Sequence, residues 1–173
     1  MRSLRMVPIV LMVLAALTAP ADDKPAAAAS LKGKYEALEV TQFTIKPGVG
    51  FPTDYLSKMN AELVLEIGEK KKFKIVYGAG NPPQQVPAAR LRLEGEVTQF
   101  KPGSQAVRYF IGFGAGKTKV KAHVKFIDVA TDQVVFEDDV DGKVIMGLLG
   151  GSSPGATRGL AKEVAKVAAK TFF

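Results

Sequence analysis

Apolar and charged side chains alternate between residues 119 and 126, and this alternation constrains the fold more than any other stretch of the chain. The apolar positions are Val120, Ala122, Val124 and Phe126, and the intervening positions are Lys119, Lys121, His123 and Lys125. Successive side chains of a strand point to opposite faces, so this pattern is typical of a strand with one buried face. It predicts a sheet whose other face meets solvent.

Four further segments are predicted to be strands, because each is rich in alternating or β-branched apolar residues and is bounded by turn residues. They are residues 35–45, 73–77, 91–98 and 134–140. The last of these follows a turn at Asp132 and Gln133, so we expect it to form a hairpin with residues 118–128.

Two segments change to helical spacing. Residues 53–68 repeat Leu56, Met59, Leu63 and Ile67, and the C-terminal stretch repeats Leu160, Val164, Val167, Ala168 and Phe172. We expect Thr53 or Asp54 to cap the first helix and Gly68 to close it. Residues 147–159, GLLGGSSPGATRG, are expected to form a flexible loop. The predicted fold is an α/β (α+β) sandwich, with a mostly antiparallel sheet of about five strands covered by two helices.

Residues 1–21 have the pattern of a secretory signal peptide. Arg2 and Arg5 precede an apolar run, and Ala19-Pro20-Ala21 offers a cleavage site after Ala21. An uncleaved anchor is the alternative. We expect export to the periplasm or the outer envelope, as a protein that is soluble after cleavage. Residues 22–34 are expected to be a flexible tether, and residues 35–173 one domain, which is long enough for a core.

The composition excludes several kinds of chemistry. The chain has no cysteine and one histidine, so one copy cannot build a His/Cys metal cluster or use a cysteine nucleophile. Gly116-Lys117-Thr118 lacks the earlier glycine of a phosphate loop, because Ile111 occupies that position, and a strand follows it. The acidic residues at 137–141 lack the spacing of an EF-hand and fit a hairpin edge that resists strand addition. We therefore expect no enzyme activity, catalytic residue, cofactor or metal.

Two surfaces are candidate partner contacts. Gly112, Gly114 and Gly116 would share one sheet face and leave a groove, although a bulge, a bend or a closely packed helix would also explain them. A basic ridge is the second surface, and either it contacts an anionic partner or it is a solvated strand face. The ridge consists of Lys117, Lys119, Lys121, His123 and Lys125. The candidate contact residues are Arg108, Gly112, Gly114, Gly116, Lys117, Lys119 and Lys121.

Several motifs follow one another in a distinctive order: LEGEVTQFKPGS, then Arg108, then IGFGAGKTKVKAHVKFIDVATDQVVFE. In these motifs the chain resembles the domain-of-unknown-function 4410 family of bacterial envelope proteins, from about Tyr35 to the C-terminal helix. The resemblance implies an exported α/β sandwich and carries over no catalytic residue. Members are often lipoproteins, and because this chain lacks the cysteine for lipid attachment, we expect a soluble periplasmic protein.

These observations favour an exported, non-enzymatic module that binds a protein or complex of the bacterial envelope. The alternative is a protein that binds a polyanion, an anionic surface or glycolipid, or a small ligand through the basic ridge. Nucleic acid is not an expected partner, because the exposed ridge positions interleave no aromatic side chains for base stacking. The sequence leaves the partner's identity and the oligomeric state open.

Overall fold

The computed structural model describes residues 31–102, 118–143 and 153–173. Two of the predicted contact residues, Lys119 and Lys121, fall within these ranges. The others lie outside them: Arg108, Gly112, Gly114, Gly116 and Lys117. The predicted signal peptide and most of the predicted tether also lie outside the described residues.

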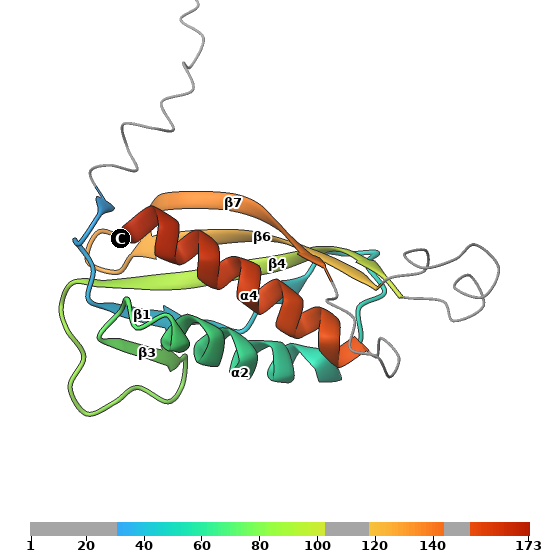
Figure 1. Ribbon diagram of the computed structural model, residues 1–173, viewed down its shortest axis with the longest axis horizontal. Helices are drawn as coiled ribbons and strands as arrows, with labels where there is room; N and C mark the ends of the chain where they lie inside the picture. The colour runs from blue at the N-terminus through green and yellow to red at the C-terminus, as the bar shows by residue number, and fades with distance from the viewer. Residues whose placement is uncertain (1–30, 103–117, 144–152) are drawn as a thin grey trace, which may run out of the picture.

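The described residues form six strands and two long helices (Figure 1). The strands are β1 (Ala37–Val40), β2 (Thr44–Ile45), β3 (Ile75–Gly78), β4 (Arg90–Lys101), β6 (Lys119–Asp128) and β7 (Gln133–Lys143). The helices are α2 (Asp54–Glu69) and α4 (Ser153–Phe172). The predicted strand over residues 35–45 is thus two strands, separated by three residues that belong to neither.

All six strands belong to one sheet, in the order β3-β1-β4-β6-β7, with β2 paired to β4. The three longest strands, β4, β6 and β7, pair antiparallel, whereas the short strands β1, β2 and β3 pair parallel. Parallel neighbours need a crossover connection, and α2 provides it between β1 and β3. The α+β class, with a mostly antiparallel sheet and two helices, is confirmed.

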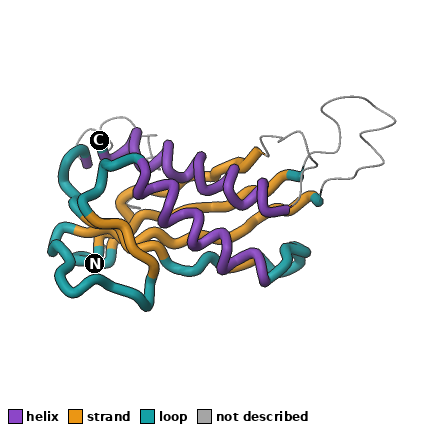
Figure 2. Tube along the Cα trace, turned by 60° about the horizontal axis from the view of Figure 1, so that its bottom comes forward, coloured by secondary structure: helices purple, strands orange, loops and turns teal. Residues whose placement is uncertain are grey.

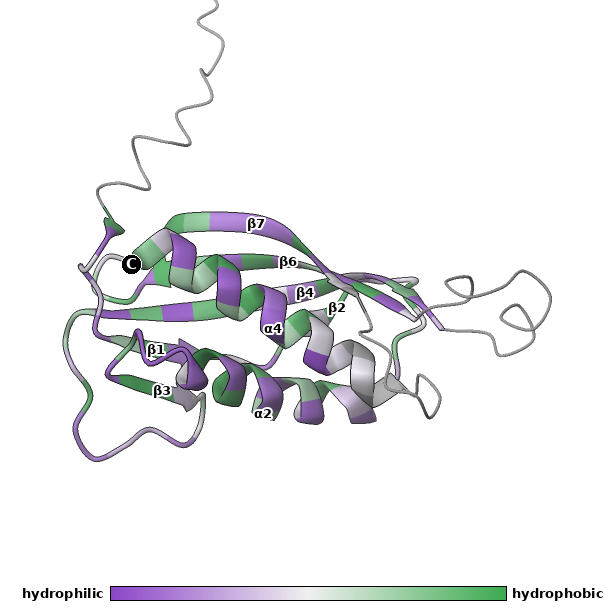
Figure 3. Cartoon of the chain, viewed as in Figure 1, coloured by the Kyte–Doolittle hydropathy of each residue, from purple (hydrophilic) through white to green (hydrophobic). Residues whose placement is uncertain are grey.

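Both helices cover the same face of the sheet, and no helix of the described residues covers the other face (Figure 2). Hydrophobic and hydrophilic residues alternate along β4 and β6, as the charge pattern predicted (Figure 3). The core between the layers includes Leu38, Leu91, Leu93, Val97, Val124 and Phe126 from the sheet. From the helices it includes Met59, Leu63, Ile67, Leu160, Val164 and Phe172.

The ends of the helices differ from the sequence predictions. Helix α4 begins at Ser153, so the predicted flexible loop over 147–159 is wrong from that residue onward; Pro154 is compatible with a first helical turn, where its missing N–H costs no hydrogen bond. Thr53 precedes α2 without a capping hydrogen bond from its side chain. Lys71 rather than Gly68 takes the left-handed backbone conformation after the helix, with φ of 53°.

The end of the predicted tether is part of the packed domain. Leu31 is buried in the core, and the Gly33 N–H donates a hydrogen bond of 2.8 Å to the Phe172 carbonyl at the end of α4. The tether prediction therefore does not hold for residues 31–34, because this segment closes the core against the C-terminal helix.

A buried carboxylate joins this N-terminal segment to the sheet. The Tyr35 hydroxyl donates to Asp128 Oδ2 at 2.9 Å, and Lys34 Nζ donates to the same oxygen at 3.2 Å. The Ala130 N–H donates to Oδ1 at 2.9 Å. Burial alone would raise the pKa of Asp128, but these hydrogen bonds outweigh it and hold the pKa below the ordinary value of 3.8.

We expect Asp128→Asn to lower the free energy of unfolding by about 1–2 kcal/mol at neutral pH, because the hydrogen bonds lose their charged acceptor. A lowered pKa in the folded state contributes stability above the unfolded pKa and loses it as the pH falls through the folded value. The difference between wild type and variant should therefore shrink below pH 3.8. Urea unfolding at several pH values measures it.

Asp132→Asn is the matched control, because Asp132 is exposed and asparagine tolerates its left-handed backbone, with φ of 54°. An equal effect of the two substitutions at every pH would contradict the role of Asp128.

Helix α4 approaches β7 so closely that position 142 has no room for a side chain. A Cβ placed on Gly142 would lie 2.8 Å from the backbone nitrogen of Leu160 and 2.7 Å from its Cβ. Leu160 is completely buried, so neither the helix nor the strand can yield without loss of packing. A closely packed helix was one explanation offered for the glycines at 112–116. Such a helix accounts for the glycine at position 142.

We expect Gly142→Ala to destabilise the fold by about 1–3 kcal/mol, because the added methyl group must push α4 away from β7. Gly68→Ala is the control: no atom lies within 4 Å of its added Cβ, and alanine favours the helix by about 0.5–1 kcal/mol. Denaturant titration of both variants tests this, and equal stability would show that α4 is not held at this distance.

Candidate functional site

The helix-free face of the sheet carries three adjacent rows of charged side chains. The middle row is the described part of the basic ridge on β6. Carboxylates stand opposite its residues 121–125, whereas Lys119 stands opposite Lys101 on β4 and Lys143 on β7. Across to β7, the register pairs are Lys121 with Asp141, His123 with Asp139, and Lys125 with Glu137. Across to β4, they are His123 with Glu96, and Lys125 with Glu94. The position of the ridge on this face confirms the predicted strand. The carboxylates lie beside the ridge because of the register in which β4 and β7 pair with β6.

Side chains of these rows pair across the face; the lysine contact is an ion pair, and the His123 contacts are ion pairs only when the imidazole is protonated. His123 Nδ1 lies 2.9 Å from Asp139 Oδ1, and its Nε2 lies 3.5 Å from Glu137 Oε2. Lys121 Nζ lies 3.8 Å from Asp141 Oδ2. Each such exposed pair contributes only about 0–1 kcal/mol to stability. Their larger effect is on the surface potential, because the carboxylates offset the positive charge of the ridge at residues 121–125.

Beside β4, the sheet is interrupted between the end of β1 and the start of β2. Val40 pairs with Leu93 and Thr44 pairs with Glu96, so three residues on one side oppose two on β4. The extra residue is a bulge, which redirects the side chains that follow it. Phe43 consequently turns into the core, where it is almost completely buried.

The ring of Phe43 packs directly against the backbone of Gly95. A Cβ at position 95 would lie 2.3 Å from Cε2 of that ring, which no real contact allows. The bulge and the glycine therefore depend on each other: the ring of Phe43 fills the volume that a side chain at position 95 would occupy.

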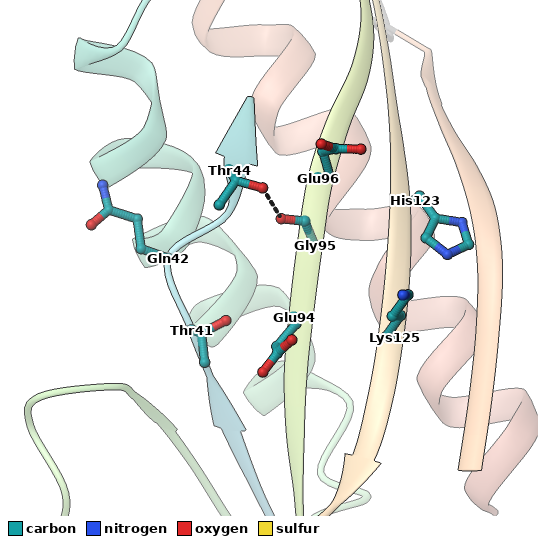
Figure 4. A pocket seen from close by; sticks show the side chains of 8 residues that line it. All are labelled: Thr41, Gln42, Thr44, Glu94, Gly95, Glu96, His123 and Lys125. Carbon is teal, nitrogen blue, oxygen red and sulfur yellow. Dashed lines mark hydrogen bonds between the residues drawn. The ribbon is translucent and has the colours of Figure 1, made fainter. Parts of the chain in front are cut away.

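A shallow pocket of about 350 Å³ lies beside this interruption on the helix-free face (Figure 4). It is lined by Thr41, Gln42, Thr44, Glu94, Gly95, Glu96, His123 and Lys125. The hydroxyl of Thr41 donates to the Leu93 carbonyl at 2.9 Å, and that of Thr44 donates to the Gly95 carbonyl at 3.4 Å. Both threonines are thereby fixed to β4, and their oxygens can still accept hydrogen bonds.

Arg92 fixes one of the pocket's carboxylates. Its Nε donates to Glu94 at 2.8 Å, and its Nη2 donates to Asp132 at the same distance. The bonds to Asp132 and Glu94 raise the pKa of Arg92. Glu96 and Lys125, by contrast, belong to none of the ion pairs within the described part of the chain.

A second polar cluster lies between the helices. Arg158 Nε donates to buried Glu66 at 2.8 Å, and Glu66 raises the pKa of Arg158. Burial raises the pKa of Glu62, while a hydrogen bond from Thr157 and the charge of Arg158 oppose that rise. Because its members bridge α2 and α4, this cluster orients the two helices.

The pocket was not predicted from the sequence. Lys119 and Lys121 lie on the same face as the pocket but outside its lining. The one sequence signal was the spacing of Leu38, Val40 and Phe43, which breaks the two-residue period by one position. Within the described residues, no group of three or more His, Cys, Asp or Glu side chains is arranged to hold a metal ion.

The family model described as "Domain of unknown function (DUF4410)" matches residues 52–170. The chain belongs to this family. The match confirms the resemblance seen in the sequence motifs. No curated protein matches the chain. None of the described helices is both long and apolar enough to cross a membrane.

Several solved structures are similar in fold. The PelC dodecamer from Paraburkholderia phytofirmans shares 18% identity, with a TM-score of 0.52 over 81% of this chain and 91% of that chain. A point variant of the same dodecamer gives 16% identity and a TM-score of 0.53, over 81% and 88%. Lipoprotein GNA1162 from Neisseria meningitidis gives 14% and 0.43, over 77% and 97%. At these identities the PelC likeness shows the fold alone.

We expect Gly95→Ala to cost about 1–3 kcal/mol of stability and to displace residues 41–44, because the new methyl group overlaps the ring of Phe43. Combining it with Phe43→Leu should recover part of the loss, since the smaller side chain leaves room. Gly50→Ala is the control, with no atom within 4 Å of the added Cβ. Denaturant titration and amide chemical shifts measure both effects, and purely additive losses would contradict the coupling.

Proposed function

We propose that this protein is an exported, non-enzymatic module of the bacterial envelope that binds a partner protein or complex through the helix-free face of its sheet. The observation that carries this proposal is the set of three charged rows on β4, β6 and β7. Backbone pairing fixes the rows relative to one another, so the face presents a rigid pattern of both signs. Such a pattern gives specificity for a surface with the complementary arrangement.

Export rests on the signal-peptide pattern of residues 1–21. The family gives no reaction, and the two PelC structures are named as dodecamers, so a chain of this fold is able to assemble with copies of itself. The partner here is accordingly either another envelope protein or further copies of this chain.

The mixture of signs favours a protein partner over a uniform polyanion. Lys121, His123 and Lys125 each have a carboxylate opposite them on β7, and the latter two also have one on β4. A polyanion laid along residues 121–125 of β6 would meet these carboxylates, whereas a protein surface can match them with its own cations. The contact hypothesis for Arg108 and the glycines at 112–116 stays a prediction.

Charge reversal on the face tests the proposal. We expect Lys121→Glu combined with Asp139→Lys to reduce capture of the native partner by about tenfold or more, because both rows then present the wrong sign. The mature protein, residues 22–173, is crosslinked in intact envelopes and recovered at low and high salt. Lys166→Glu, on an exposed part of α4, is the control.

Retention of the same partner by wild type, the face variant and the control, all folded by circular dichroism, would contradict the assignment of this face. Failure of wild type to crosslink to any protein, including itself, would contradict the binding function.

Small-ligand binding is a second candidate function, and the pocket beside the β1–β2 interruption favours it. The carboxylates of Glu94 and Glu96 line the pocket together with Lys125 and His123, so a polyanion is the less suitable ligand. If Lys119→Gln combined with Lys121→Gln weakens a salt-sensitive interaction with anionic vesicles, the result supports binding to an anionic surface rather than to a small ligand.

A further inference from the structure

We propose that the pocket beside the β1–β2 interruption binds a small zwitterionic group, with one ammonium and one carboxylate, as in a free amino acid or a short peptide. This inference rests on the proposed function, because it makes the helix-free face a recognition surface. It adds the class of ligand and the side chains that would bind its two charges.

The first argument is that two opposite charges in the pocket lack an ionic partner. Glu96 and Lys125 are both half-buried, and neither takes part in an ion pair within the described residues. Glu94 and His123, the other ionisable groups of the lining, are paired with Arg92 and Asp139. Half-buried charges without a partner gain most from an added counter-charge.

The second argument is the distance between Glu96 and Lys125. Glu96 stands opposite His123, and Lys125 stands opposite Glu94, so Glu96 and Lys125 are diagonal neighbours on adjacent strands. Diagonal positions are about 7–8 Å apart, a separation that a ligand of a few atoms can span to contact both side chains. Figure 4 shows both side chains at the pocket, on β4 and β6.

The third argument favours a ligand with both charges over a ligand of one sign. An anion at Lys125 would leave the carboxylate of Glu96 without a counter-charge, and a cation at Glu96 would leave Lys125 without one. A ligand with both charges places its carboxylate toward Lys125 and its ammonium toward Glu96, and so satisfies both groups.

The uncharged side chains that line the pocket also suit a zwitterionic ligand. Thr41 and Thr44 hold their hydroxyls on the backbone of β4, which leaves their oxygens as acceptors for an ammonium. Gln42 is exposed at the rim and offers both a donor and an acceptor. The lining includes no Phe, Tyr or Trp side chain, so it lacks the flat apolar surface on which a sugar ring would stack.

The experiment is titration of the mature chain, residues 22–173, with glycine and with triglycine, followed by amide chemical shifts and calorimetry. We expect saturable shifts at residues 94–96 and 123–125. Glu96→Gln and Lys125→Gln should each weaken binding by about tenfold, since each removes one charge-assisted contact. Lys166→Gln is the control, because that residue lies on α4.

Acetate, methylammonium and glucose are the comparison probes. Binding of acetate, methylammonium or glucose as strongly as glycine would overturn the ligand class, and no saturable binding by either zwitterion would overturn the site. Stronger binding of glycine supports a free amino acid as the source, and stronger binding of triglycine supports a peptide. Because Lys121 and Asp139 do not line the pocket, loss of ligand binding with intact partner capture separates failure of this inference from failure of the proposed function.

Discussion

The antiparallel pairing of β4, β6 and β7 is the constraint on which the rest of the structure depends. Burial of one face of β6 stabilises the fold, because Val120, Val124 and Phe126 are completely removed from solvent and each contributes about 1.5–3 kcal/mol. A shift of the pairing by one residue would exchange the buried and exposed faces and expose all three. The same pairing therefore determines both the core and the positions of the charges on the opposite face.

Close packing at two glycines connects this sheet to its surroundings. Because Gly142 has no side chain, helix α4 packs closely against β7, and because Gly95 has none, the ring of Phe43 packs beside β4. The first contact holds a helix over the buried face, and the second turns the chain at the interruption between β1 and β2. The pocket on the helix-free face lies beside this interruption.

The elements with strong periodicity were predictable, and those set by long-range contacts were not. The spacing of Leu56, Met59 and Leu63 predicted α2 to within one residue at each end. The start of α4 was missed because glycine and proline at 153–159 are typical of loops, whereas packing of Thr157 and Leu160 against the rest of the fold makes this segment helical. Local propensity is weak compared with such burial.

The sequence by itself determined which side chains of β6 are buried and which are exposed, because a strand's two-residue period needs no knowledge of its neighbours. It also determined family membership, through motifs that residues 52–170 share with the family model. Only the tertiary structure decided that carboxylates on β4 and β7 flank the basic ridge, since strand order and register bring together residues distant in the chain. The pocket was decided in the same way, because the chain at residues 41–44 meets Gly95 and Lys125 only in the folded sheet.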